Sequence, residues 1–243
     1  MYRIYVYLIL QQKKLADIKN DFISNISHEL KTPIATTLAA VQGMQYFDVL
    51  KDDKKTEQYL STASNELERL SAMVTKILNI SIFESADFTL NPTEFNLKEL
   101  IESIIASQEI RQEKPISLTL NYLAAETVFA DKTHLYNVII NLIDNAIKYS
   151  ADKVTISIDC MNIPKGIKLS IQDDGPGIAQ EYQKNVFDKF FRVPNPNDHS
   201  VKGYGLGLNY VKHIIEKHGG TIAIKSDDTG SIFIIKLSQY APL

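Results

Sequence analysis

Apolar residues in the first third of the chain recur at the spacing of two long helices. The central run of fours in the first helix departs from a strict heptad, so we expect its apolar seam to drift there. In the second helix steps of three and four alternate, which is typical of a coiled-coil seam. The two sets are Leu15, Ile18, Phe22, Ile26, Leu30, Ile34, Leu38 and Val41, and then Leu60, Ala63, Leu67, Leu70, Val74 and Ile77.

The polar segment Asp48–Lys55 separates the two helices and is long enough for a helix–helix turn. A single hairpin cannot bury both apolar stripes well, whereas two hairpins together can form a four-helix bundle. The pattern therefore predicts a long antiparallel helical hairpin that pairs with a second copy as a homodimer.

From about residue 91 the period changes to that of a mixed α/β domain. Turn residues at Asp227–Gly230 predict a hairpin at the end of this domain. We expect four segments, namely a membrane-proximal stub at 1–14, a helical domain at 15–83, a hinge at 84–90 and an α/β domain at 91–243. The predicted strands are 116–120, 154–159, 167–172, 221–225 and 232–237, and the predicted helices are 97–109, 134–149 and 208–217.

The composition is ordinary for a soluble globular protein, with 44% hydrophobic and 23% charged residues. A net charge of −3 gives no general electrostatic reason to expect nucleic-acid binding. The single cysteine, Cys160, rules out an intramolecular disulfide and lies in an apolar run, where a buried structural thiol is expected. No cluster of Cys and His residues predicts a metal site.

The N-terminus is apolar and aromatic over Ile4–Leu10 and then polar and basic over Gln11–Lys14. Seven apolar residues cannot span a bilayer, which needs about 20. One interpretation is an ordinary helix start that packs on its partner. We favour the stub of a transmembrane helix with interfacial tyrosines and cytoplasmic lysines, which places the chain in the cytoplasmic portion of an inner-membrane protein. A secretory signal does not fit, because the n-region and the cleavage site are both missing.

His28 is a candidate for exposed chemistry on the first helix. At 100° per residue it lies about 180° from the local stripe of Ile26 and Leu30. Thr32 shares its face, and Pro33 is expected to bend the helix one turn beyond it. An exposed helical histidine is usually an ordinary surface residue, so any role for His28 depends on the sequence around it.

A polar stripe follows the predicted helix 134–149. Apolar residues cover the rest of that helix, and a plain solvated face is the alternative interpretation. Asparagines at four-residue spacing beside a lysine favour ligands, because amide oxygens suit Mg²⁺ and lysine suits phosphate. The stripe, within about 100° of arc, consists of Asn137, Asn141, Asp144, Asn145 and Lys148.

Two glycine-rich turns follow this helix. Asp173–Gly177 comes after a strand, and its glycines allow the backbone to turn close to a ligand. Gly203–Gly207 precedes a helix, whose amide donors and positive dipole end suit phosphate. Each turn is a weak signal alone, and neither is a P-loop or a dinucleotide-binding motif.

In order and spacing these segments resemble those of sensor histidine kinases of two-component systems. Phe22–Pro33, which contains His-Glu-Leu-Lys-Thr-Pro, resembles their phosphoacceptor box. The N, G1, F and G2 boxes of their ATPase domains are matched by Asn141–Ser150, Asp173–Gly177, Val186–Arg192 and Gly203–Gly207. The resemblance covers nearly the whole chain. It implies a dimerisation and histidine phosphotransfer domain followed by a catalytic ATP-binding domain, a Bergerat-type α/β sandwich whose mixed sheet is covered on one side by helices.

The resemblance also implies a reaction. His28 would be autophosphorylated from ATP, Glu29 would accept its proton, and the phosphoryl group would pass to the aspartate of a response-regulator receiver domain on a separate chain. Thr32 would assist the reverse reaction, a phosphatase activity on that regulator.

ATP and Mg²⁺ are the implied ligands of the second domain. Asn145 with Asn141 would hold Mg²⁺, Lys148 would meet phosphate, Tyr149 would lie by the adenine, and Asp173 would accept the adenine amino hydrogen bond. Residues 179–202 would form a mobile lid. The other implied nucleotide-binding residues are Gly175, Gly177, Phe187, Gly203, Gly205, Gly207 and Leu208.

Two positions depart from the family pattern. Tyr204 stands where a small residue is common, and Asp174 stands where asparagine is common, so that an extra carboxylate is expected to weaken nucleotide affinity. The remaining histidines match no box and are expected to be surface or packing residues; they are His134, His199, His213 and His218.

Three other functions remain open. The chain could be a binding-only scaffold with a degenerate nucleotide site, although every residue that the chemistry needs is present. It could be a chaperone-type or mismatch-repair-type ATPase of the same superfamily, which would have no use for the His28 box. It could also act chiefly as a phosphatase on its partner.

Overall fold

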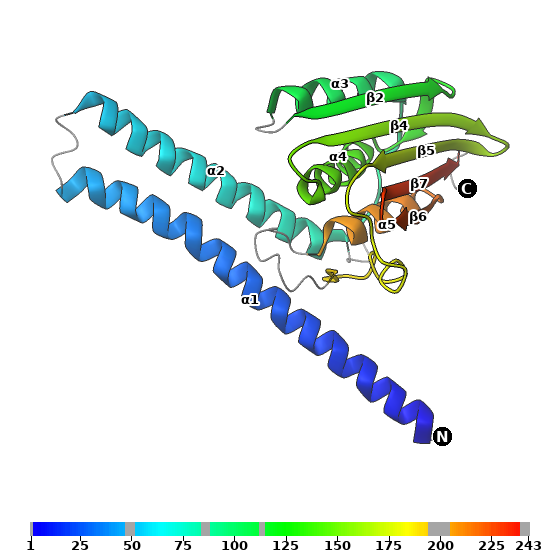
Figure 1. Cartoon of the computed structure of the whole chain (residues 1–243), viewed down its shortest axis with the longest axis horizontal. Coiled ribbons are helices and arrows are strands. Elements are labelled where there is room, and N and C mark those ends of the chain that lie inside the picture. Colours follow the sequence, from blue (N-terminus) through cyan, green and yellow to red (C-terminus); the bar gives the residue numbers. More distant parts are fainter. Residues whose placement is uncertain (1, 47–51, 84–87, 112–114, 194–204, 239–243) are drawn as a thin grey trace. The chain divides into compact units, whose positions relative to one another are not determined.

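The chain divides into two units, Met1–Phe88 and Thr89–Leu243 (Figure 1). The structure is a computed structural model and describes residues 2–46, 52–83, 88–111, 115–193 and 205–238. The predicted hinge at 84–90 and the predicted turn at Asp48–Lys55 therefore lie partly outside the described residues.

The first unit is a helical hairpin made of α1 (Tyr2–Tyr46) and α2 (Asp53–Phe83) (Figure 1). Small residues line the face where the helices meet. They are Ala40 and Gly43 on α1 and Ala63 on α2, and all three are buried. The ring of Tyr59 occupies the space that a side chain at Gly43 would need. The small side chains thus let the two helices approach closely.

Several long apolar residues of both helices remain exposed beside this contact. On α2 the predicted seam residues Leu60, Leu67 and Val74 stay exposed within one chain, while Ala63 of the same stripe is buried against α1. Exposed fractions within one chain are 52%, 54% and 36% for Ile34, Leu38 and Val41, and 55%, 53% and 41% for Leu60, Leu67 and Val74. One hairpin therefore leaves two apolar stripes uncovered, as the sequence predicted.

Helix α1 continues through Pro33, so the proline does not end it. The Pro33 side chain is buried. Among the described residues, no helix combines the length and the apolar character needed to cross a membrane.

The second unit is built on a five-stranded mixed sheet with the order β2-β4-β5-β7-β6. Strands β2 and β4 run parallel, and every other neighbouring pair runs antiparallel. Asp227 pairs with Gly230, which confirms the predicted terminal hairpin. The strands are β2 (Ile116–Leu123), β4 (Val154–Ile163), β5 (Gly166–Asp173), β6 (Thr221–Asp227) and β7 (Gly230–Ser238).

One face of this sheet supplies the core. Ile158 and Cys160 on β4 are buried and lie beside Ile171 and Leu169 on β5, which are buried as well. Helices α3 (Leu97–Arg111), α4 (Lys132–Tyr149) and α5 (Gly207–Lys217) pack against the sheet. The α/β sandwich is thus confirmed. Burial raises the pKa of the Cys160 thiol to about 12, as expected of a structural cysteine.

Two short strands were not predicted. β1 (Thr93–Asn96) and β3 (Thr127–Ala130) form an antiparallel pair outside the main sheet. Four residues are too few to display a clear period of two, so their pairing depends on contacts distant in sequence. This pair leads the chain directly into the start of α4.

Candidate functional site

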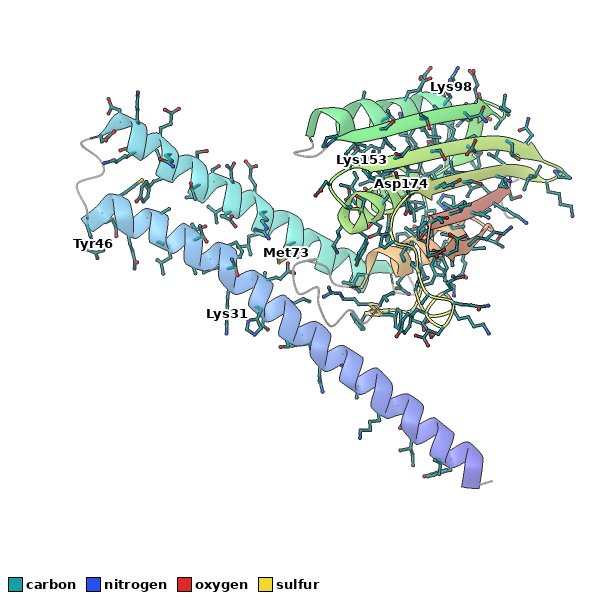
Figure 2. The ribbon with its side chains drawn as sticks, in the orientation of Figure 1. Lys31, Tyr46, Met73, Lys98, Lys153 and Asp174 are labelled. Carbon is teal, nitrogen blue, oxygen red and sulfur yellow. The ribbon has the colours of Figure 1, made fainter. Side chains whose placement is uncertain are left out.

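His28 lies on α1 with its side chain exposed, as its angular position predicted. Thr32, one turn later, is exposed as well, and its hydroxyl donates to the backbone carbonyl of His28 at 3.3 Å. Glu29 is half-buried, and Lys31 projects from the helix (Figure 2). The imidazole and the threonine hydroxyl therefore share one accessible side of the first unit.

Helix α4 carries the predicted polar stripe and starts at a strong cap. The Asp131 carboxylate accepts the backbone N–H of His134 at 3.1 Å, which satisfies one of the free donors of the first turn. Its other oxygen accepts the N–H of Asn91 at 2.8 Å. The apolar side of the helix is buried, so the stripe is held at the edge of the core.

Asn141 and Gly207 are brought together by the fold. The Asn141 amide donates to the carbonyl of Asn137 at 2.7 Å, which turns its oxygen the other way. A Cβ at Gly207, the first residue of α5, would lie 2.9 Å from that oxygen. An amide oxygen of the N-box helix therefore faces the end of the second glycine turn, and Leu208 follows half-buried in the first turn of α5.

The end of α4 places a cation beside an aromatic ring. The Lys148 ammonium lies 5.0 Å from the centre of the Tyr149 ring, which is within the range of a cation–π interaction. Tyr149 is 47% exposed, and Asn145 is half-buried one turn before it. These three side chains lie near the C-terminal end of the polar stripe.

Asp173 ends β5 and begins the first glycine turn. Its carboxylate accepts the N–H of Gly175 at 2.9 Å, and it is half-buried. Burial raises the pKa of Asp173, and the charge of the neighbouring Asp174 raises it further. Hydrogen bonds from Gly175 and Ser231 oppose this rise. Gly177 has φ +70°, and a side chain there would overlap the carbonyl oxygen of Asp227. The turn is therefore sterically confined to glycine at that position.

Asp174 links the first glycine turn to the start of β4. Its carboxylate accepts the N–H of Thr155 at 2.8 Å, and its own N–H donates to the carbonyl of Thr155 at 3.3 Å. Burial acts to raise the pKa of Asp174, but the hydrogen bonds from Thr155 and the charge of Lys153 outweigh it and lower that pKa. Lys153 and Asp174 are labelled in Figure 2. This departure from the family pattern therefore has a structural use at the start of β4.

The F-box segment meets the second glycine turn at its base. Phe187 packs edge-on against Phe233 of the core, with ring centres 6.4 Å apart. The N–H of Phe190 donates to the carbonyl of Gly205 at 2.8 Å. Gly205 has φ +65°, so the left-handed backbone and the contact with Phe190 both favour glycine there. The predicted site residue Gly203 lies outside the described residues.

Several residues near the site had no role in the sequence prediction. The Asn209 amide in the first turn of α5 donates to the carbonyl of Phe187 at 3.0 Å. The N–H of Asp131 donates to Nε2 of His218, a buried histidine whose Nδ1 lies 2.8 Å from the carbonyl of Ile214. An aspartate just before a helical run is a recognisable capping signal, but nothing local reveals the partners of Asn209 or His218.

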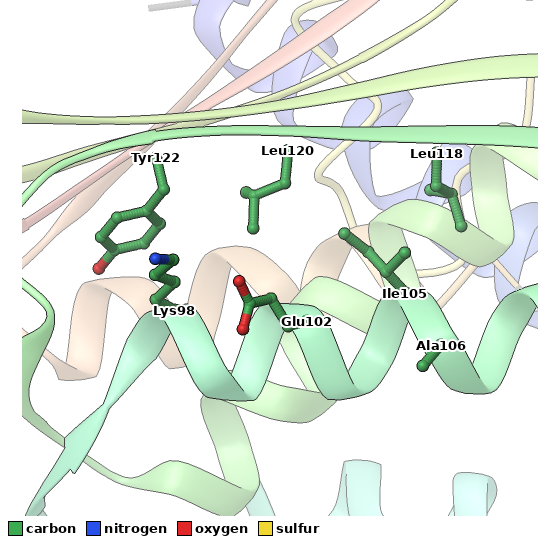
Figure 3. A pocket seen from close by; sticks show the side chains of 7 residues that line it. All are labelled: Lys98, Glu102, Ile105, Ala106, Leu118, Leu120 and Tyr122. Atoms are coloured by element: carbon green, nitrogen blue, oxygen red, sulfur yellow. The ribbon is translucent and has the colours of Figure 1, made fainter.

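A separate groove of about 480 Å³ lies between α3 and β2 (Figure 3). It contains none of the predicted site residues and is lined by Lys98, Glu102, Ile105, Ala106, Leu118, Leu120 and Tyr122. Over the part of the chain that the structure describes, no group of three or more His, Cys, Asp or Glu side chains could hold a metal ion.

Two family models match the chain in the order that the motifs predicted. The model of the His Kinase A (phospho-acceptor) domain matches residues 18–86. The model of the histidine kinase-, DNA gyrase B- and HSP90-like ATPase matches residues 130–241. His28 lies in the first match, and all predicted nucleotide-binding residues lie in the second.

Curated relatives are sensor proteins. RprX of Bacteroides fragilis is 40% identical over 237 residues, which cover 96% of this chain and 46% of RprX. SrrB of Staphylococcus aureus is 33% identical over 230 residues, which cover 94% of this chain and 39% of SrrB. The chain thus spans less than half the length of these relatives.

Solved structures with the same architecture are histidine kinases. The histidine kinase AdeS of Acinetobacter baumannii has a TM-score of 0.65 and 30% identity, over 87% of this chain and 98% of AdeS. The histidine kinase ThkA, solved in complex with the response regulator TrrA, has a TM-score of 0.64 and 27% identity, over 94% of this chain and 64% of ThkA. The chain belongs to the sensor histidine kinases of two-component systems, with a phospho-acceptor domain followed by an ATPase domain.

Proposed function

We propose that this chain is the kinase core of a sensor protein, which uses ATP with Mg²⁺ to phosphorylate its own His28 and then passes the phosphoryl group to a response regulator. The observation that carries the proposal is the exposed imidazole of His28, followed directly by Glu29, within the matched phospho-acceptor domain. The same chain supplies an ATPase-family domain with both glycine turns.

Asp173 is the proposed reader of the adenine base. An ionised carboxylate only accepts hydrogen bonds, so it suits the amino group of adenine and not the carbonyl of guanine. One of its oxygens already accepts the N–H of Gly175, which orients the carboxylate. Tyr149 is proposed to lie beside the adenine, and Lys148 to neutralise a phosphate.

Asn141 and Asn145 are the proposed protein ligands of Mg²⁺. The amide oxygen of Asn141 faces Gly207, next to the turn where we place the phosphates. Because Mg²⁺ prefers six oxygen ligands and keeps several waters, phosphate and water oxygens would complete its shell. The bound ion would neutralise charge on the triphosphate.

The proposed transfer starts from neutral imidazole. One ring nitrogen of His28 attacks the γ-phosphorus, the bond from that phosphorus to the β–γ bridging oxygen breaks, and ADP leaves. Glu29 accepts the proton from the other ring nitrogen, so that positive charge does not remain on the ring. The predicted joint at 84–90 is our candidate hinge for bringing the γ-phosphate to His28.

The proposed phosphoryl acceptor is an aspartate on a separate receiver protein. Its support is the similarity to ThkA, which was solved in complex with the response regulator TrrA. We also propose a homodimer, because one hairpin leaves the two apolar stripes uncovered. Attachment to an inner membrane is proposed from the apolar and then basic sequence of residues 4–14.

Incubation of the full chain with γ-labelled ATP tests the proposal. We expect an acid-labile, alkali-stable label that disappears in His28→Gln and remains in the control His213→Gln. Glu29→Gln should slow labelling by about 10²-fold, since it removes the proton acceptor but keeps the nucleophile. Steady ATP hydrolysis that is unchanged in His28→Gln, without a label, would instead support an ATPase of the wider superfamily, and neither label nor hydrolysis would support a scaffold.

A phosphatase activity on the regulator is the second candidate function. It is favoured by Thr32, whose hydroxyl lies one turn from His28 on the same exposed side. Thr32→Ala should leave labelling of His28 intact and slow dephosphorylation of a phosphorylated regulator. The conservative variant Thr32→Ser should retain both activities.

A further inference from the structure

The segment 178–191 follows the first glycine turn and contains the F-box phenylalanines, and side-chain amides hold it at two points. At its start, the Gln183 amide donates to the carbonyls of Ile178 and Ser226 at 2.8 and 2.7 Å. At its end, the Asn209 amide donates across to the carbonyl of Phe187 at 3.0 Å. The segment is therefore held on β6 at one end and on the first turn of α5 at the other.

Asn209 lies close to the second glycine turn, so a small displacement of Asn209 would also move that turn. It lies two residues after Gly207 and is half-buried. The backbone beside its bond is unusual, because Phe190 has φ +67°, the single non-glycine positive φ in the described part of the chain. Such a conformation persists only where its surroundings hold it, and the bond from the N–H of Phe190 to Gly205 provides one such restraint.

Two hydrogen bonds form what we call the clasp. One runs from the Asn209 side-chain amide to the carbonyl of Phe187, and the other from the N–H of Phe190 to the carbonyl of Gly205. Phe187 anchors one side of it, since its ring packs against Phe233 in the core. The other side is the glycine turn and the start of α5, where Gly207 faces the oxygen of Asn141. The clasp therefore fixes the backbone amides of the α5 N-terminus relative to the core and to the N-box helix.

We infer that Asn209 is a positioning residue for the phosphate end of the bound nucleotide, through its hydrogen bond to Phe187. The inference rests on the proposed ATP site. Amide donors bind phosphate well only when their directions are held in advance, so loosening the clasp weakens phosphate binding. The adenine side of the site is held separately, by Asp173 and Gly175 and by the Gln183 contacts.

The test compares nucleotides that differ only in their phosphates. Affinities of the full 243-residue chain for ATP and ADP are measured by calorimetry, and affinity for adenosine by NMR titration. In Asn209→Ala and Asn209→Asp, we expect ATP and ADP to bind about three- to tenfold more weakly, the range for one lost hydrogen bond, with adenosine unchanged. Asn185→Ala is the matched control, because its amide donates to Asp188 within the same segment at 2.7 Å.

Each other outcome overturns the inference. Unchanged ATP affinity in both Asn209 variants means that the clasp does not position the phosphates. Parallel loss for ATP and adenosine, together with a lower melting temperature, means that Asn209 only stabilises the fold. If Asn209→Asp does not fold, Asn209→Ala alone decides between these results. Failure of the unaltered chain to bind ATP would overturn the proposed function itself, which separates that failure from the failure of the inference.

Discussion

The side-chain oxygen of Asn141, in the middle of α4, lies against Gly207 at the start of α5, 2.9 Å from where a Cβ would stand. A methyl group at Gly207 would meet the end of one side chain and not a backbone, so the Asn141 amide can rotate away at the cost of its hydrogen bond to the Asn137 carbonyl. The same rotation would remove its oxygen from the proposed Mg²⁺ position. Asn141 can therefore hold its oxygen at the proposed Mg²⁺ position only if residue 207 has no side chain.

Gly207→Ala should therefore keep the fold but lose ligand affinity. We expect Mg²⁺-dependent ATP affinity to fall about tenfold, which corresponds to about 1.4 kcal/mol, with little change in melting temperature. A double-mutant cycle with Asn141→Ala checks the mechanism. In the Asn141→Ala background the second substitution should cost almost nothing, and additive losses would contradict the explanation.

Two glycines with similar backbone angles should respond very differently to alanine. Gly177 has φ +70° and faces the carbonyl of Asp227, whereas Gly219 has φ +68°. Among the described residues, apart from its two chain neighbours, no atom lies within 4 Å of where a Cβ of residue 219 would stand. Gly219→Ala should cost about 1–2 kcal/mol of unfolding free energy, the cost of the left-handed conformation. Gly177→Ala should cost more than about 3 kcal/mol, since the backbone must also move. Urea denaturation of both variants gives the comparison, and equal losses would rule out the steric term.

The exposed apolar stripes of the hairpin should control the oligomeric state. Leu38 and Leu67 are each more than half exposed in one chain, so replacing either with glutamate should leave the hairpin folded. We expect light scattering to give twice 27.4 kDa for the unaltered chain and 27.4 kDa for Leu38→Glu or Leu67→Glu. Leu123→Glu, at a 69% exposed position of the second unit, should stay dimeric. Dimeric Leu38→Glu and Leu67→Glu variants would show that another surface pairs the chains.

The stability of the second unit should decrease in mild acid because of His134. Burial lowers the pKa of His134 from its usual 6.5, although Asp131 opposes this, and Nδ1 lies 3.0 Å from the Tyr210 hydroxyl. Below pH 6.5 the unfolded chain therefore binds more protons than the folded chain, so unfolding free energy falls as the pH drops through this window. Above the window the contribution is constant.

Urea titrations at about pH 5.5, 6.5 and 7.5 measure this dependence. His134→Gln should flatten the curve over the acidic half of that range, while His28→Gln, at an exposed position of the first unit, should retain it. An identical pH dependence in His134→Gln would assign the effect to other groups.

Much of this protein is encoded in short stretches of its sequence. The exposure of His28 follows from its angle to Ile26 and Leu30, because helix geometry alone sets which residues share a face. The β6–β7 hairpin follows from the turn residues Asp227–Gly230, and the motif order identifies the family. The first two features depend on neighbours within a few residues, and each family motif is itself a short segment, so local chemistry is sufficient to specify them.

The tertiary structure decided which distant groups meet. Nothing near Asp131 in the sequence points to His218, 87 residues away, and nothing near Asn209 points to the carbonyl of Phe187. The apolar residues of α2 form one stripe in sequence, yet only the structure shows that Ala63 is buried against α1 while Leu67 stays more than half exposed. Such contacts form only when the whole core packs, since hydrogen-bond donors and apolar faces accept any partner that the backbone path brings within reach.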